Sequence, residues 1–250
     1  MDFPLLVSVT SLALMAFSTW VGTVLRRRAG VSPEDVRHES TNLMAGAILT
    51  LLFFLIGFTF SMAVHRYDVR KECEQAEAIA IGTAYSRADL LVPADAAKVQ
   101  TLLKKYLDQR LSFYMTRGHA RASEISADTA QTQAQLWSTL RPAIAAVPPP
   151  LMGVLVTGLN DVINSQRSCQ GAWLNRIPVA AWALVMIIGI GSCWLMGYRA
   201  RRTDWLAFML VPIAVSVCFF LIADLDSPRG GVIRVIPQNL SILSQSLPAQ

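Results

Sequence analysis

Apolar residues gather in four long segments of the chain, which are separated by short polar stretches and by one long polar insert. The segments span 4–25, 44–64, 178–198 and 205–223. A helix rises about 1.5 Å per residue, so segments of this length match a hydrocarbon core of about 30 Å. The fourth contains Pro212, which removes one backbone hydrogen bond and predicts a kink. The pattern therefore predicts an all-α polytopic membrane protein with four transmembrane helices.

The polar insert between the second and third segments, residues 65–177, has the pattern of a helical bundle. Its first helix continues the second apolar segment without a breaker. A second helix opens at Pro93, with an apolar face made of Val99, Leu102, Leu103, Tyr106 and Leu107. A third helix over 123–146 is expected to break near Pro142, and a fourth runs from Leu151 toward Trp173. We therefore divide the chain into transmembrane helices 1 and 2 (1–64), an extramembrane helical domain (65–177), transmembrane helices 3 and 4 (178–223) and a mostly irregular extramembrane tail (224–250).

The first apolar segment differs from a secretory signal peptide. Only Met1 and Asp2 precede it, so it has no basic leader, and Arg26, Arg27 and Arg28 follow where a cleavage site would need small residues. We expect an uncleaved transmembrane helix.

The amino-acid composition narrows the class of protein further. Hydrophobic residues make up 53% of the 250 residues, and charged residues make up 16%, against about 25% in soluble domains. This composition excludes a disordered chain and a typical soluble enzyme. It predicts that the protein lies in a lipid bilayer, which is then one of its partners. The net charge of +5 does not indicate a nucleic-acid partner, because no Lys/Arg stripe with interleaved aromatic residues occurs outside the apolar segments.

Positive charge gathers in the two short loops, and this predicts the orientation. Loop 26–43 contains four arginines and loop 199–204 contains three. Because such loops face the cytoplasm, both termini and the large domain are expected outside it. Arg66, Arg70 and Lys71 weaken this bias, since they flank a span on the opposite side.

Two of the four cysteines lie at matching positions in the helical extensions. Cys73 follows the second span by nine residues, and Cys169 precedes the third by nine residues. Both would lie roughly 13 Å above the membrane on continuing helices, which permits a disulfide if the helices are neighbours. A disulfide would fit an oxidising compartment, but two unrelated thiols explain the sequence equally well. Cys193 and Cys218 lie inside spans and are expected to act as small apolar residues.

One face of the second span carries small and polar residues along its whole length. Its members recur at steps of three or four residues and are Gly46, Thr50, Phe54, Gly57, Ser61, His65, Asp68 and Glu72. We call the four residues Thr50, Phe54, Gly57 and Ser61 the stripe. Such a face suits a pore wall, with Phe54 as a hydrophobic constriction. It suits close packing between transmembrane helices equally well, so both interpretations stay open.

Charged residues at the ends of the second and fourth spans share one side of the membrane. His65, Arg66 and Asp68 follow the second span, and Asp224 and Asp226 end the fourth. They predict either a structural ion pair, with Asp224–Arg66 the simplest, or a selective pore mouth.

The sequence contains no motif for catalysis or for a cofactor. The three histidines are isolated, no Cys/His ligand cluster occurs, and no Walker or GxSxG motif is present. We therefore expect neither an enzyme nor a bound metal or cofactor.

Three blocks of sequence resemble a bacterial bestrophin-like membrane protein family of unknown function. They are GFTFSMAVHRYDVR (57–70) with EAIAIGTAYSRADLL (77–91), NRIP (175–178), and DLDSPRGG with IRV (224–231 and 233–235). The order of two spans, a helical insert, two spans and this tail extends the resemblance over nearly the whole chain. Bestrophins are oligomeric ion channels with a central pore, so the resemblance implies a homo-oligomer that conducts inorganic ions.

The resemblance and the charge count disagree on orientation. Bestrophins keep their large domain in the cytoplasm, whereas the arginine bias places it outside, which would be the periplasm for a bacterial inner-membrane protein. The leading functional hypothesis is a homo-oligomeric ion channel with the second span lining the pore. The alternative is a non-conducting membrane interaction or sensor protein whose helical extramembrane domain binds a partner.

Overall fold

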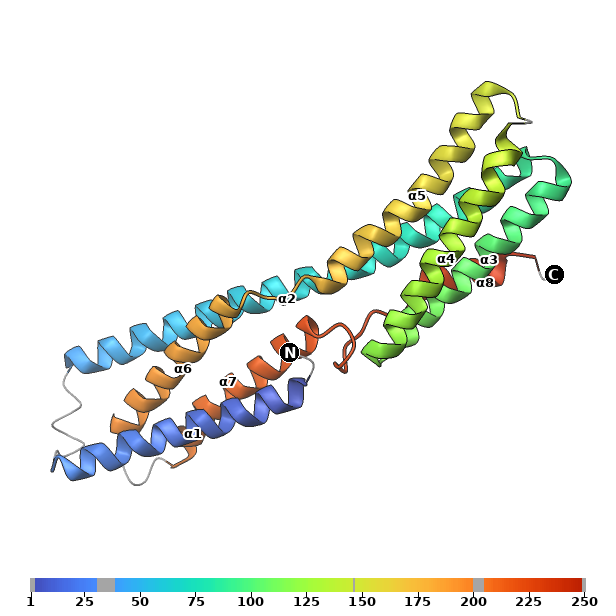
Figure 1. The fold of residues 1–250 in the computed structure, drawn as a ribbon. Helices are drawn as coiled ribbons and strands as arrows, with labels where there is room; N and C mark the ends of the chain where they lie inside the picture. The colour runs from blue at the N-terminus through green and yellow to red at the C-terminus, as the bar shows by residue number, and fades with distance from the viewer. Residues whose placement is uncertain (1–2, 31–38, 146, 200–204, 249–250) are drawn as a thin grey trace. The chain divides into compact units, whose positions relative to one another are not determined.

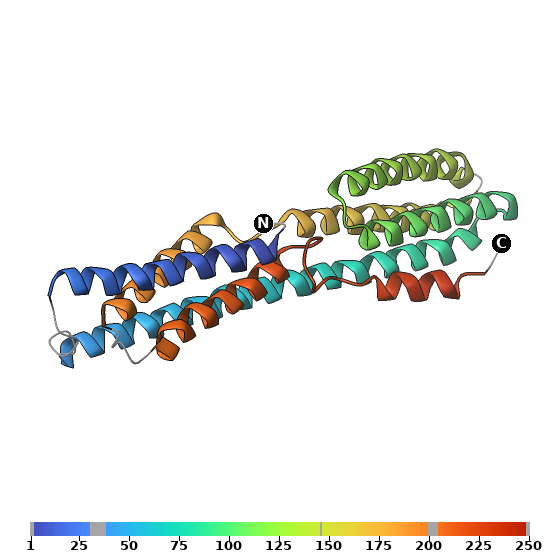
Figure 2. The ribbon, with the colours of Figure 1, turned by 90° about the horizontal axis from the view of Figure 1, so that it is seen from below.

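The computed structural model describes residues 3–30, 39–145, 147–199 and 205–248. Throughout these ranges the regular elements are helices, and Figures 1 and 2 show the chain in two views. The elements are α1 (Pro4–Arg28), α2 (Glu39–Arg87), the 3₁₀ turn η1 (Ala88–Leu90), α3 (Pro93–Met115), α4 (His119–Ile144), α5 (Pro149–Leu174), α6 (Val179–Arg199), α7 (Trp205–Asp226) and α8 (Gln238–Ser246). The expectation of an all-α fold is confirmed.

Four helical stretches of the described residues are long and apolar enough to cross a membrane. They lie within Pro4–Arg28, Asn42–Leu90, Pro149–Arg199 and Met209–Asp226. The fold is therefore that of an all-α membrane protein with four transmembrane helices.

The chain divides into two compact units. The transmembrane unit is Met1–Arg66 with Arg176–Ile233, and the bundle unit is Tyr67–Asn175 with Arg234–Gln250. Helix α2 contributes residues to both units, and so does the C-terminal segment.

Proline and glycine mark several helix ends. Helices α1, α3 and α5 each begin at a proline, a position where the missing N–H costs nothing because it would have no helical partner. Gly30 follows α1 with a φ of 66°, a left-handed conformation that favours glycine. The expected break of α4 at Pro142 does not occur. Helix α4 includes Pro142 and ends two residues later at Ile144, and the proline removes one backbone hydrogen bond from its last turn.

The transmembrane unit is held together by close helix crossings. Helix α1 packs against α6 and α7. A Cβ added to Gly197 would lie 1.9 Å from the Thr19 carbonyl oxygen, and one added to Gly22 would lie 2.3 Å from the Trp194 carbonyl oxygen. These two glycines therefore let the backbones of α1 and α6 approach closely, as small residues do between membrane helices.

The bundle unit has its own hydrophobic core. Tyr106, Leu107 and Leu103 from α3 are almost fully buried, together with Leu136 from α4 and Val162 from α5. The apolar face that was predicted for the helix after Pro93 supplies the α3 part of this core.

The C-terminal segment differs from the irregular tail that was expected, because it carries α8. The Glu74 carboxylate of α2 accepts hydrogen bonds from the Asn239 side-chain amide (2.6 Å) and from the Leu240 backbone N–H (2.8 Å). Leu240 is fully buried, and Leu243 packs over Gly82. A carboxylate from another helix thus caps the first turn of α8 and satisfies N–H groups that have no partner within the helix.

Candidate functional site

The stripe on α2 is exposed in the single chain. Thr50, Phe54, Gly57 and Ser61 all lie on the surface, and Phe54 is 68% exposed. A Cβ added to Gly57 would meet no atom within 4 Å. The Thr50 hydroxyl donates to the Gly46 carbonyl of its own helix at 2.9 Å. No described part of the chain packs closely on the stripe at Gly57, so packing within one chain does not explain the small residue there.

The opposite face of α2 is the packed one. Leu52 and Ala63 are fully buried, and Ile56 and Thr59 are 5% exposed. A Cβ added to Gly189 of α6 would lie 3.8 Å from Leu52 Cδ1. The two faces of the helix therefore have different roles, and only the buried one builds the transmembrane unit.

Hydroxyl groups elsewhere in the transmembrane unit contact neighbouring helices. The Ser216 hydroxyl of α7 donates to the Ser8 carbonyl of α1 at 2.7 Å, and the Ser18 hydroxyl donates to the Ile190 carbonyl of α6 at 2.8 Å. Such hydrogen bonds between helices replace water in an apolar setting. The stripe on α2 differs from these serines, because its threonine hydroxyl is bonded only within its own helix.

The residues predicted at the end of the second span lie in different surroundings. His65 and Asp68 are exposed, whereas Arg66 is half-buried and donates to Met62 Sδ at 3.9 Å. Exposed His65 follows the stripe by one turn on the same helix face.

The two aspartates that end α7 are buried and bind backbone amides. Asp224 accepts from the N–H groups of Val232 and Ile233, both at 2.7 Å, and Asp226 accepts from the Ile177 N–H at 3.0 Å. Each Asp224 carboxylate oxygen thus accepts a backbone N–H from the loop that follows α7, and the Asp224–Arg66 ion pair stays a prediction. Asp224 therefore holds the segment after α7 against the end of that helix, and Asp226 binds the segment that precedes α6.

Gly231 is the last residue of the DLDSPRGG block, and its close contacts explain why this position is a glycine. A Cβ at this position would lie 2.6 Å from the Asp224 carbonyl oxygen and 3.1 Å from its carboxyl carbon. The loop can therefore pass the helix end closely only with glycine here.

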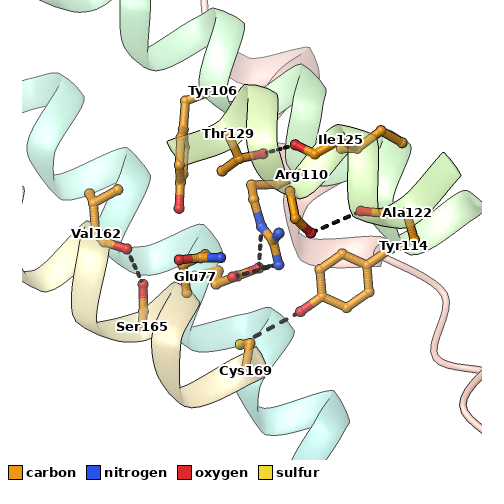
Figure 3. A network of polar contacts seen from close by, with 12 residues as sticks. Glu77, Tyr106, Arg110, Tyr114, Ala122, Ile125, Thr129, Val162, Ser165 and Cys169 are labelled. Atoms are coloured by element: carbon orange, nitrogen blue, oxygen red, sulfur yellow. Dashed lines mark hydrogen bonds and ion pairs between the residues drawn. The ribbon is translucent and has the colours of Figure 1, made fainter. Parts of the chain in front are cut away.

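The bundle unit contains a buried polar network, which Figure 3 shows from close by. Arg110 of α3 forms an ion pair with Glu77 of α2, with Nη2 2.9 Å from Oε1, and neither side chain is exposed. The guanidinium also donates to Oε2 from Nε (3.3 Å) and from Nη2 (3.2 Å). It lies 4.4 Å from the centre of the Phe113 ring, a cation–π distance. Burial raises the pKa of Glu77, and the Arg110 guanidinium acts in the opposite direction.

The Glu77–Arg110 pair was not predicted from the sequence, although the spacing of residues along α3 contains a signal for it. Arg110 continues the apolar face of Val99, Leu103 and Tyr106 at helical spacing. An arginine in line with core positions needs a buried partner, and Glu77 supplies it.

The two extramembrane cysteines lie together at one end of this network. Both are free thiols; Cys169 is fully buried and Cys73 is half-buried. The Tyr114 hydroxyl donates to Cys169 Sγ at 3.7 Å (Figure 3). A hydrogen bond from the Cys169 thiol lowers the pKa of Cys73, although burial and the carboxylates of Glu77 and Glu72 oppose this. The same contact, together with burial, raises the pKa of Cys169.

The disulfide between Cys73 and Cys169 that the sequence permits stays a prediction. Within the described ranges, no group of three or more His, Cys, Asp or Glu side chains is arranged to hold a metal ion.

Comparisons with known proteins identify the class of protein to which the chain belongs. A bestrophin-like domain matches residues 12–240. A point variant of a bacterial bestrophin homolog from Klebsiella pneumoniae superimposes with a TM-score of 0.67 at 14% identity, covering 95% of this chain and 96% of that chain. A further crystal structure of that homolog gives a TM-score of 0.64 at 15% identity, covering 96% and 99%. None of the functionally curated proteins matches significantly.

The fold and the four membrane-spanning segments define an integral membrane protein with the bestrophin architecture. The domain match extends over most of the chain, and the protein belongs to the bestrophin-like family. The resemblance inferred from the sequence is thereby confirmed.

Proposed function

We propose that the protein is a homo-oligomeric ion channel in which the exposed face of α2 lines an axial pore. The observation that carries this proposal is the division of α2 into two faces. One face packs in the transmembrane unit at Leu52, Ile56 and Ala63, while the stripe remains exposed from Thr50 to Ser61. Membership of a family known for ion channels supports the same conclusion.

Conduction requires several copies of the chain around one axis. A single bundle of four helices is too narrow to hold a water column beside packed phenylalanine side chains. In a ring, each copy turns one face toward the axis, and α2 offers a face that is small and polar over its membrane-spanning length. Subunit packing and pore lining are compatible functions of this face, because both need small residues.

Phe54 is the constriction in this proposal. Its ring is 68% exposed and lies one turn from both Thr50 and Gly57 on the stripe. A ring of phenylalanines around an axis would form a hydrophobic barrier that restricts ion passage. His65 and Asp68, exposed further along α2, would place titratable groups at the mouth through which inorganic ions enter.

We further propose that the termini and the bundle unit face the periplasm from the bacterial inner membrane. Arg26, Arg27 and Arg28 at the end of α1 support this orientation, because positive charge collects on the cytoplasmic side. Alkaline phosphatase fused after Gln250 should then be active outside the cytoplasm. A fusion that is inactive there, with a cytoplasmic reporter active at the same position, would reverse the orientation without affecting the pore proposal.

Ion flux through purified protein in liposomes tests the pore. Phe54→Ala should raise flux several-fold, because it widens the constriction. Phe53→Ala is the matched control: it removes the same side chain at the same depth, from a residue that is 45% exposed but turned about 100° around the helix. Leu52→Ala, on the opposite face, is a poorer control, since Leu52 is fully buried.

Equal flux from the two phenylalanine variants would show that the stripe does not line a pore. If wild type and both variants form folded particles without flux, the protein is a non-conducting interaction or sensor protein, and a partner of the bundle unit should then be sought.

A further inference from the structure

Two helices of the bundle unit bring Cys73 and Cys169 together. Helix α5 runs beside α2, as Figures 1 and 2 both show. Arg87 of α2 donates to the Val154 carbonyl of α5 at 3.4 Å, and Gly158 of α5 allows this close approach. Further along the same pair of helices, the Cys169 thiol lies close enough to Cys73 to favour its thiolate.

We propose that Cys73 and Cys169 form a redox-active dithiol that is oxidised by small-molecule disulfides, with Cys73 as the attacking thiol and Cys169 as the resolving thiol. The site is separate from the stripe and does not depend on whether the protein conducts ions. The structure, with both thiols free, corresponds to the reduced form.

The reaction has two exchange steps. The Cys73 thiolate attacks one sulfur of the small disulfide, whose S–S bond breaks, so that a mixed disulfide forms and one small thiolate leaves. The Cys169 sulfur then attacks the Cys73 sulfur, the mixed disulfide breaks, and a second small thiolate leaves while the Cys169 proton passes to it. The protein loses two electrons in total, and the small disulfide gains them as it becomes two thiols.

The surroundings of the two sulfur atoms indicate which thiol attacks the small disulfide first. Cys73 is half-buried, so a small reagent can reach it, whereas Cys169 is fully buried. The hydrogen bond from Cys169 favours the Cys73 thiolate and lowers the pKa of Cys73, and the thiolate is the reactive form. The raised pKa of Cys169 keeps that sulfur protonated until Cys73 has reacted.

Oxidation would also change what holds α2 to α5. Cys73 precedes Glu77 by one turn on α2, and Cys169 contacts both Tyr114 and Glu77. A covalent bond between the two sulfurs would replace a thiol hydrogen bond beside the buried Glu77–Arg110 pair. The redox state of the dithiol therefore determines whether α2 and α5 are covalently linked to each other within the bundle unit.

Mass spectrometry of the full-length protein in detergent tests the proposal. The background carries Cys193→Ala and Cys218→Ala, so that only the two thiols of interest remain. Reduced protein is mixed with oxidised glutathione and quenched with acid. The double-alanine protein should lose both free thiols and keep no glutathione. Cys169→Ser should stop with one glutathione on Cys73. Cys73→Ser should react at Cys169 at least about tenfold more slowly, because a buried, protonated thiol is a poor nucleophile.

Three results would overturn the proposal. They are a Cys73→Ser protein that takes up glutathione on Cys169 as fast as Cys169→Ser does on Cys73, a Cys169→Ser protein with no adduct, and a double-alanine protein that keeps both thiols or retains glutathione. Cys169→Ala repeats the second measurement, and size-exclusion chromatography confirms that each variant is folded, so a folding defect cannot imitate these results.

Discussion

The Arg110 guanidinium lies 2.9 Å from a Glu77 carboxylate oxygen, and both side chains are completely buried in the bundle unit. Each charge is desolvated, so each depends on the other. The pair joins α2 to α3 at a depth where water cannot replace a missing partner.

Glu77→Gln should destabilise the bundle unit strongly, by ~3–5 kcal/mol, because it leaves the Arg110 charge buried without a counter-charge. Thermal unfolding in detergent measures this. Glu124→Gln is the matched control, since Glu124 pairs with Arg121 at 2.8 Å but both side chains are largely exposed. An exposed pair contributes less than about 1 kcal/mol. Equal losses in the two variants would contradict the assigned role of burial.

Arg110→Met should behave differently, because Glu77 can become neutral by binding a proton. Burial already raises the Glu77 pKa, and removing Arg110 removes an influence that lowers it. The native state then holds a proton that the unfolded state has lost. The stability of Arg110→Met should therefore be greatest below the ordinary glutamate pKa and should fall as the pH rises above it, toward the raised pKa of Glu77. The double variant Glu77→Gln/Arg110→Met should lack this slope, and a slope of opposite sign in Arg110→Met would refute the assignment.

The crossing of α1 and α6 gives a second test of packing. Gly197→Ala would place a Cβ 1.9 Å from the Thr19 carbonyl oxygen, so the two backbones must separate. We expect a loss of ~1–3 kcal/mol, typical of overpacking. Gly191→Ala on the same helix has no atom within 4 Å and should be neutral or slightly stabilising, because alanine favours helix. Similar unfolding midpoints for the two variants would count against the close crossing.

The Glu74 cap on α8 predicts a local effect. Glu74→Ala removes the acceptor for the Asn239 amide and the Leu240 N–H, which should cost ~1–2 kcal/mol of α8 stability. Hydrogen exchange should speed up in Gln238–Ser246 and stay unchanged in α3. Glu72→Ala, two residues away on α2 and exposed, is the control. An unchanged rate of hydrogen exchange in α8 after Glu74→Ala would contradict this role of Glu74. It would mean that apolar contacts, such as that of Leu240, are sufficient to stabilise α8.

The long helices could be predicted from the sequence because apolar length and helical periodicity are local properties. The second span and its polar extension share one uninterrupted pattern, and α2 does run from Glu39 to Arg87. The face after Pro93 predicted which α3 residues enter the core, for the same reason.

Interactions between distant segments could not be predicted in this way. Helix α8 is short and is capped by Glu74 from another helix, so its own sequence gives little signal. Asp224 has charged residues available as partners, but the backbone amides of the loop that follows it are closer along the chain and take both oxygens. Glu77 and Arg110 meet only once the bundle has packed.

Cysteine accessibility along α2 gives the most direct test of which face meets water. In a background with all four native cysteines replaced, Thr50→Cys, Gly57→Cys and Ser61→Cys place thiols on the stripe. A charged, membrane-impermeant thiol reagent needs water and a thiolate, so these three positions should react in liposomes and block flux. Phe53→Cys and Phe60→Cys, which are about 70° and about 90° away from the centre of the stripe, should stay unmodified, because a thiol in lipid remains protonated. Reaction at neither set would place the stripe against lipid or a neighbouring subunit. Reaction at both sets would indicate a loosened transmembrane unit, and only selective reaction on the stripe supports an axial, water-filled pore.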